Sequence, residues 1–203
     1  MVPAPKSTIN INSQVDYKRE DWKRSVNEFR EVPKTRLGWT ELDFKSNLKS
    51  SPPKVAICQN CVCKEGLIAL IYITEFEINI TALIKVTTVN WIDVPRRKRG
   101  EWEALHAAIL AHENLHVRDA EGVIGDAKKV AAKYQSRALW RTACATDQVG
   151  IKTAIDELKA ELKEIENKQR NDIGNWISRR YQVLRDALDL REGSIRIRDY
   201  ISE

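Results

Sequence analysis

Apolar and polar residues alternate along much of the first half of the chain, a pattern typical of strands that bury one face. Residues 67–73 form a continuous apolar run, and residues 76–91 are rich in β-branched side chains. Residues 1–16 are expected to be an extended lead-in, residues 38–44 alternate as a strand does, and residues 58–66 suit a hairpin arm or turn. Together these segments predict an antiparallel sheet of about three to five strands.

Three segments show a helical period instead. Trp22, Val26 and Phe29 recur at helical spacing, which predicts a short helix over residues 17–31. Residues 100–141 contain no proline and keep a helical period, and a second long helix is expected over residues 150–190. The second helix carries apolar residues in a coiled-coil-like seam with spacings of 4, 3, 4 and 3, namely Ile151, Ile155, Leu158, Leu162 and Ile165.

The expected class is therefore α+β, with a small antiparallel sheet followed by a long α-helical hairpin. We expect a single domain over residues 1–203, with a strand part at 1–95 and a helical part at 100–192. The 42% hydrophobic residues are enough to bury a core. No run approaches the ~20 apolar residues of a membrane span, and residues 1–6 contain no apolar stretch of the signal-peptide type.

The net charge of the chain gives little information about its binding partners. Its 34 basic and 29 acidic residues leave a formal net charge of +5, which is too mild for a dedicated nucleic-acid binder. The basic run at residues 96–99 is best interpreted as a solvated connector. Binding of an anionic polymer through this run ranks last, since no aromatic stacking pattern accompanies it.

The most specific motif is His112-Glu113-Asn114-Leu115-His116, a His-Glu-x-x-His sequence on a predicted helix. Histidines at i and i+4 lie one turn apart on the same face, so both rings can bind one zinc ion. Zinc lowers the pKa of a coordinated water to ~7, and the adjacent Glu113 carboxylate is the expected general base. The histidines also continue an apolar stripe formed by Trp102, Leu105 and Ile109, which places them on the inner face of the helix.

The third zinc ligand has no histidine candidate, because none follows His116. Asp119 lies on the correct face but is far along the helix, so it fits better as a partner that orients a histidine. If the helical hairpin turns near residues 146–149, the histidines face the part of the second helix near Tyr181 and Asp186. Asp186 is then the expected ligand, and Tyr181 the expected donor to a developing oxyanion.

His106, the remaining histidine, is expected to be structural. It lies about 120° around the helix from His112, by the 100° per residue of an α-helix.

The four cysteines, Cys58, Cys61, Cys63 and Cys144, allow two interpretations. They suit two disulfides in an oxidising compartment, and one of the possible pairs, Cys63 with Cys144, would join the sheet to the long helix. The spacing Cys58-x-x-Cys61-x-Cys63 also resembles half of a structural zinc site.

Val94-Pro95, Trp102 and Leu110-Ala-His112-Glu113-x-x-His116 together resemble domain-of-unknown-function family 922. This bacterial family is described as predicted secreted zinc-dependent proteases. The resemblance would cover roughly residues 10–190 and implies an exported metallopeptidase, secreted or periplasmic. It also implies that His112 and His116 are ligands and that Glu113 is the base.

These observations lead to a single-zinc hydrolase acting on a peptide or protein substrate as the first functional expectation, either a secreted protease or a toxin or effector delivered by a dedicated machine. A non-catalytic interaction module is the alternative, in which the 151–190 helix would mediate oligomerisation or partner binding around a degenerate metal site. The absence of an acidic third ligand beside the two histidines would favour the alternative.

Overall fold

The computed structural model describes residues 5–30, 37–64, 66–135 and 139–191, together with 197, 200 and 201. Six strands precede or separate two long helices, with short helices between them. The expected α+β class is confirmed. The strands form two three-stranded sheets rather than one.

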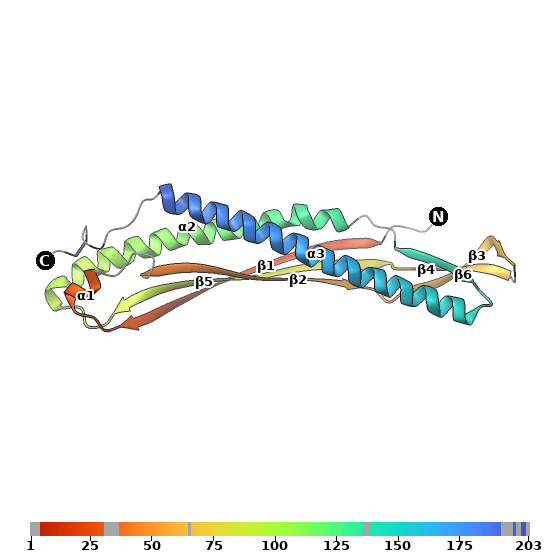
Figure 1. Cartoon of the computed structure of the whole chain (residues 1–203), viewed down its shortest axis with the longest axis horizontal. Helices are drawn as coiled ribbons and strands as arrows, with labels where there is room; N and C mark the ends of the chain where they lie inside the picture. Colours follow the sequence, from red (N-terminus) through yellow and green to blue (C-terminus); the bar gives the residue numbers. More distant parts are fainter. Residues whose placement is uncertain are drawn as a thin grey trace. The chain divides into compact units, whose positions relative to one another are not determined.

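The first sheet has the strand order β1-β5-β2 (Figure 1). Its strands are β1 (Lys6–Trp22), β5 (Glu75–Trp91) and β2 (Gly38–Ser50), so the strands expected at 38–44 and 76–91 are present. Residues 1–16 were expected only as an extended lead-in; Lys6–Trp22 instead forms β1, a full strand of the sheet.

The helix expected over residues 17–31 is wrong for its first half. Only α1 (Val26–Arg30) is helical, and residue 31 lies outside the described residues. The start signal lies at Ser25, whose hydroxyl and backbone N–H both donate to the Glu28 carboxylate, while the Glu28 N–H returns a bond to the Ser25 hydroxyl. This reciprocal capping fixes the helix start after Ser25 and leaves the preceding residues to the sheet.

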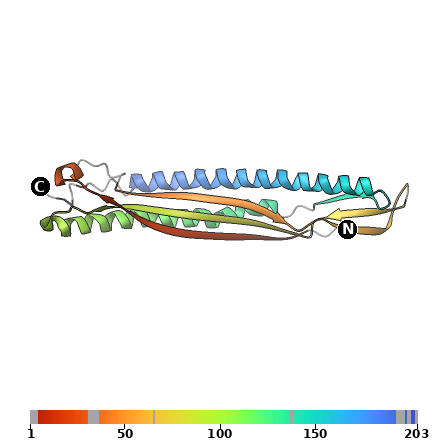
Figure 2. The same cartoon turned by 90° about the horizontal axis from the view of Figure 1, so that it is seen from below.

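The second sheet consists of β3 (Lys54–Cys63), β4 (Gly66–Tyr72) and β6 (Trp140–Cys144), paired antiparallel with β4 in the middle (Figure 2). β6 corrects the sequence-based helix that was expected to reach about residue 141. The backbone leaves the helix after Ala131, and Trp140–Cys144 finds its hydrogen-bond partners on β4. Residues 136–138 of that expected helix lie outside the described residues.

The long helices are α2 (Arg99–Ala131) and α3 (Gln148–Arg191). The 3-10 turn η2 (Arg96–Lys98) leads into α2, so the basic run is partly helical. Lys98 is buried there and lies 3.3 Å from the Glu101 carboxylate. A second 3-10 turn, η3 (Ala132–Tyr134), follows α2. The α3 seam is buried within the chain at Leu158, Leu162 and Ile165.

The chain forms two compact units, and each draws on both strand and helix. One unit, here called the disulfide unit, takes in residues up to 11, 45–81 and 126–176. The other, the histidine unit, takes in residues 12–44, 82–125 and those from 177 onward. The units therefore cut across the expected division into a strand part and a helical part.

An aromatic cluster forms the core of the histidine unit. Phe29 stacks on Trp91 with ring centroids 4.5 Å apart, and Trp102 meets both rings edge-on. The other buried members are aliphatic: Leu37, Val89, Leu105, Ile109, Ile197 and Ile201. Because Trp102, Leu105 and Ile109 lie on α2 just before the motif, this core fixes the helix that carries the two histidines.

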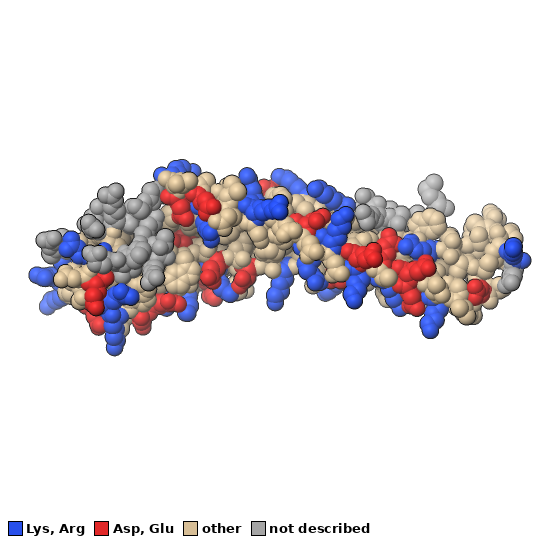
Figure 3. All heavy atoms as spheres, in the orientation of Figure 1, with Lys and Arg blue, Asp and Glu red and all other residues tan. Residues whose placement is uncertain are grey.

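Charges are mixed on the surface. On the face drawn in Figure 3, basic and acidic side chains are interspersed rather than gathered into separate fields. None of the helices in the described residues combines the length and apolarity that a membrane crossing needs.

Candidate metal centre

The two motif histidines lie on the buried face of α2. The stripe expected from the sequence is present: Trp102, Leu105 and Ile109 are buried, and His112 and His116 continue it with relative exposures of 6% and 4%. An i, i+4 pair on such a stripe cannot turn its rings to solvent without unwinding the helix, so both rings point inward.

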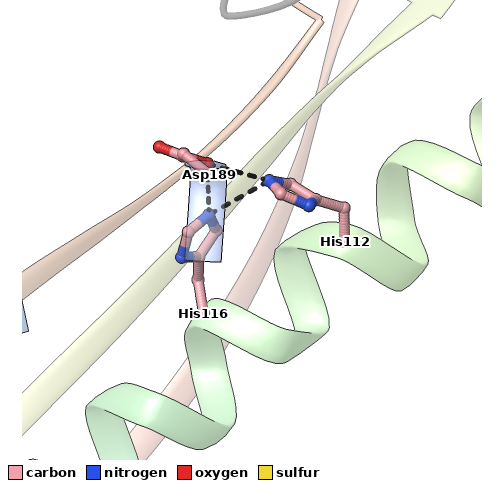
Figure 4. Close-up of side chains that lie close together, drawn as sticks. All are labelled: His112, His116 and Asp189. Atoms are coloured by element: carbon pink, nitrogen blue, oxygen red, sulfur yellow. Dashed lines mark hydrogen bonds and ion pairs between the residues drawn. The ribbon is translucent and has the colours of Figure 1, made fainter. Parts of the chain in front are cut away.

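Asp189, on the last turn of α3, completes a group of three ligating atoms (Figure 4). Its Oδ1 lies 3.1 Å from Nε2 of His112 and 3.2 Å from Nε2 of His116. The two Nε2 atoms are themselves 3.2 Å apart. The three atoms therefore form a nearly equilateral triangle within the histidine unit.

This triangle has the dimensions of one face of a tetrahedral metal site. Ligand atoms about 2.0–2.1 Å from a zinc ion are separated from one another by roughly 3.3 Å. Two neutral imidazoles and one carboxylate also carry a net negative charge, which favours a divalent cation at their centre. The Asp189 side chain is 51% exposed, so solvent reaches the group from that side. The donor set and its spacing fit a metal ion.

Burial disfavours the charged form of His116, and a histidine that binds a metal must be neutral. Desolvation lowers the pKa of His116 and outweighs the opposing charge of Asp189, with smaller contributions from His112, which lowers the pKa, and Asp119, which raises it. The other ring nitrogen, Nδ1, is buried and has no hydrogen-bond partner in the described part of the chain. When Nε2 binds a cation, the ring proton is on this Nδ1.

Asp186, the ligand expected from hairpin geometry, is not in the group. Its carboxylate is exposed, accepts a hydrogen bond from Gln182 Nε2 at 2.7 Å and lies 3.8 Å from Arg185 Nε. Asp186 was expected on the assumption that the two long helices are joined directly by a short turn. Because β6 intervenes before α3 begins, the histidines meet α3 one turn further along, at Asp189.

Glu113, the expected base, is buried beside strand β2. Its exposure is 5%, and its Oε2 accepts a hydrogen bond of 2.7 Å from the Thr40 hydroxyl. Gly38 makes room for it: a Cβ at that position would lie 3.2 Å from both Cγ and Oε1 of Glu113 and 2.6 Å from Cγ2 of Ile109. Sequence reasoning missed both residues, although a glycine opening an alternating strand is a signal of close backbone approach.

Tyr181, the expected oxyanion donor, is buried on α3. Its hydroxyl donates a long hydrogen bond of 3.5 Å to the Thr40 carbonyl. Burial raises the pKa of Tyr181 to about 12; the charges of Glu113, Asp119 and Asp189 also raise it, while Arg185 lowers it. The hydroxyl therefore keeps its proton at neutral pH and acts as a donor.

His106 lies outside the metal group, on another side of α2. Its Nε2 is 3.3 Å from the Thr88 hydroxyl, and its ring lies 5.6 Å from the Trp102 ring, centroid to centroid. It lines a hollow of about 630 Å³ together with residues that include Arg19 and Arg99. Burial lowers the pKa of His106, and the charge of Arg19 lowers it further.

The cysteines form two disulfides, Cys58–Cys61 and Cys63–Cys144. The pair considered from the sequence, Cys63 with Cys144, is thus present. Cys144 lies at the end of β6 rather than on a long helix, so the bond joins the two outer strands of the second sheet. With the four thiols paired, the cysteine zinc site considered from their spacing does not form.

Comparisons of the chain with models of protein families, with curated proteins and with solved structures found no significant match. The resemblance to family 922 therefore stays a prediction. What the protein does has to be inferred from the chemistry of the group formed by His112, His116 and Asp189.

Proposed function

We propose that the protein is a zinc-dependent peptidase whose metal ligands are His112, His116 and Asp189. One observation carries the proposal: two imidazole nitrogens from α2, the helix that also bears the motif glutamate, and a carboxylate oxygen from α3 lie 3.1–3.2 Å from one another. The donor set alone would also suit iron(II), which binds two histidines and one carboxylate in many proteins. The glutamate next to the first histidine favours zinc and hydrolysis.

Zinc at such a site supplies an acidified water and polarises a carbonyl group. Glu113 is the group in this chain that accepts the proton of the attacking water and later donates it to the leaving amine. Thr40 holds the Glu113 carboxylate through a 2.7 Å hydrogen bond, which limits the orientations of that base. Tyr181, protonated at neutral pH, exchanges its long hydrogen bond to the Thr40 carbonyl for one to the oxygen on which negative charge develops.

The proposed substrate is a peptide or protein, and the proposed location is outside the cytoplasm. Two disulfides support an oxidising compartment, because disulfides persist where thiols are not kept reduced. This agrees with the secreted or periplasmic location that the family resemblance implies.

The alternative of a non-catalytic interaction module loses its two supports. An acidic third group is present beside the histidines, and its position matches a metal ligand. The α3 seam that would serve oligomerisation is buried at Leu158, Leu162 and Ile165 within the chain itself.

Metal analysis followed by a peptidase assay tests the proposal. Purified protein, never exposed to chelator, is expected to hold one zinc ion per chain, and a quenched-fluorescent casein is expected to be cleaved. Glu113→Gln should keep zinc but lose cleavage by about 100-fold or more, since it removes only the base. Protein that binds iron in place of zinc, or cleavage that survives Glu113→Gln, would contradict the peptidase assignment.

A further inference from the structure

The chain that follows α3 comes back to the core of the histidine unit. Ile197 and Ile201 are buried there, with exposures of 4% and 0%, and Tyr200 packs against the same cluster. The backbone N–H groups of Tyr200 and Ile201 both donate to the Ile197 carbonyl, at 3.1 and 2.8 Å. These three residues, here called the return segment, are held by packing and by these two hydrogen bonds.

The return segment and the metal group share one face of α2. Ile197 and Ile201 belong to the cluster that contains Trp102, Leu105 and Ile109. The next positions of the same helical stripe are His112 and His116, which meet Asp189. The cluster that contains the return segment and the metal group therefore both draw on the same stripe of α2.

Asp189 is the least secured of the three ligands. It lies in the last turn of α3, two residues before Arg191, where the helix ends. Its side chain is half exposed, whereas both histidines are buried. The last turn of a helix opens at a lower free-energy cost than its interior unless tertiary contacts prevent it. Ile197, the next described residue, lies six positions after Arg191, so its packing in the core limits how far the end of α3 can move away.

We propose that docking of the return segment and metal binding are coupled. Docked, the return segment restrains the last turn of α3 and holds Asp189 at the histidines; undocked, it lets that turn open and leaves two ligands. The coupling is reciprocal, so a bound metal ion strengthens docking by the same factor as docking strengthens metal binding. The inference rests on the metal ligands of the proposed function, and not on peptidase activity.

Zinc titration of a variant with Ile197→Ala and Ile201→Ala tests the coupling. This variant weakens docking, and its zinc affinity is expected to fall about tenfold, within the usual range of a coupling between two sites. Val89→Ala is the matched control, because Val89 is equally buried in the same cluster but lies on β5. It removes side-chain atoms from the same cluster on β5 and leaves the return segment's own side chains intact, so its zinc affinity should stay within about twofold of the wild type.

Hydrogen exchange supplies the reciprocal measurement without any assay of activity. Zinc should slow exchange of the Tyr200 and Ile201 amides in the wild type by about the same tenfold factor, and have no such effect in Asp189→Asn. Equal zinc affinities for the return-segment variant and Val89→Ala, or amide exchange that ignores zinc, would overturn the coupling. Zinc-bound protein that shows the coupling but cleaves no peptide would overturn the proposed function alone.

Discussion

The disulfide unit and the histidine unit are held together by different means. In the disulfide unit, two covalent bonds tie β3 to itself and to β6, and Arg141 of β6 contacts Glu161 of α3 at 2.6 Å. Polar pairs also connect α3 to the rest of this unit: Gln169 contacts Ser46 of β2 in a buried pair, and Asp172 contacts Tyr134 of η3 in a part-buried one. In the histidine unit, stacked aromatic rings and aliphatic side chains form the core.

This difference determines where chemistry can occur. In the part of the chain that the structure describes, the grouped metal-ligating side chains lie in the histidine unit. Cysteines in the other unit are consumed by disulfides and cannot bind metal. A rigid apolar core directly before His112 holds two histidines still without covalent bonds, and leaves one side of the group open. The two units should therefore respond to different perturbations.

The largest expected effect is loss of metal from the histidine unit. His112→Ala or His116→Ala should weaken zinc binding by well over about 100-fold, since altering even an outer partner of a ligand costs about 10–100-fold. Elemental analysis and a competitive zinc titration measure this loss. His106→Ala and Asp186→Asn serve as controls that keep zinc. If either control loses zinc as fully as the ligand variants, the assignment of ligands is wrong.

Removing the long-range disulfide should act on the other unit. Cys63→Ser with Cys144→Ser opens a loop with a sequence separation of 81 residues, which is expected to cost about 4 kcal/mol of unfolding free energy. Cys58→Ser with Cys61→Ser opens a separation of only 3 and should cost about 2 kcal/mol. Urea denaturation measures both costs. Zinc affinity should be unchanged in each double variant, and its loss would show that the units are not independent.

The next largest effect is expected from breaking the contact between Thr40 and Glu113, which should destabilise the histidine unit. Thr40→Val keeps the shape but leaves a buried carboxylate without its 2.7 Å donor, at a cost of about 2–3 kcal/mol. Thr40→Ser restores the hydroxyl and should recover most of that stability. Denaturation midpoints, together with casein cleavage by the zinc-loaded variants, measure the effect. Equal behaviour of the two substitutions would mean that the hydroxyl contributes nothing.

Filling the space at Gly38 should lower the unfolding free energy somewhat less than the loss of the Thr40 hydroxyl does. Gly38→Ala places a Cβ within 2.6 Å of Ile109 Cγ2, so α2 must shift, at about 1–3 kcal/mol. Gly122→Ala is the matched control, because the residue is inside α2 and, apart from the chain neighbours and the nearby backbone of that helix, no atom of the described residues lies within 4 Å of a Cβ there. The control should stabilise the protein by up to about 1 kcal/mol. Thermal unfolding checks both expectations: the melting temperature should fall for Gly38→Ala and rise for Gly122→Ala.

The smallest expected effect is on pH dependence. Burial, aided by Arg19, lowers the pKa of His106 from its ordinary value of 6.5 in the folded state. The unfolded state therefore binds the proton first as the pH falls, so the stability that the neutral ring provides is present above about pH 6.5 and is lost below it. His106→Gln should flatten the pH dependence of the melting temperature between about pH 7.5 and pH 5. A slope equal to that of the wild type would contradict this role.

The sequence determined the local features of the protein. Alternation and β-branched runs predicted most of β2, β4 and β5, and the absence of proline with a helical period predicted the bodies of α2 and α3. The histidine pair was predictable because an i, i+4 spacing on one helix fixes the geometry of both rings without help from the rest of the fold. The same stripe correctly placed both rings on the buried face.

Only the tertiary structure decided what depends on distant segments. Trp140–Cys144 is a strand because β4 provides its hydrogen-bond partners, and the local sequence pattern does not predict this pairing. Asp189, rather than Asp186, faces the histidines because the register of α3 depends on the whole connection that contains β6. Thr40 and Gly38 surround Glu113 although more than 70 residues separate them in the chain. Sequence patterns encode contacts a few residues apart, whereas pairing across long loops is selected by the packing of the whole fold.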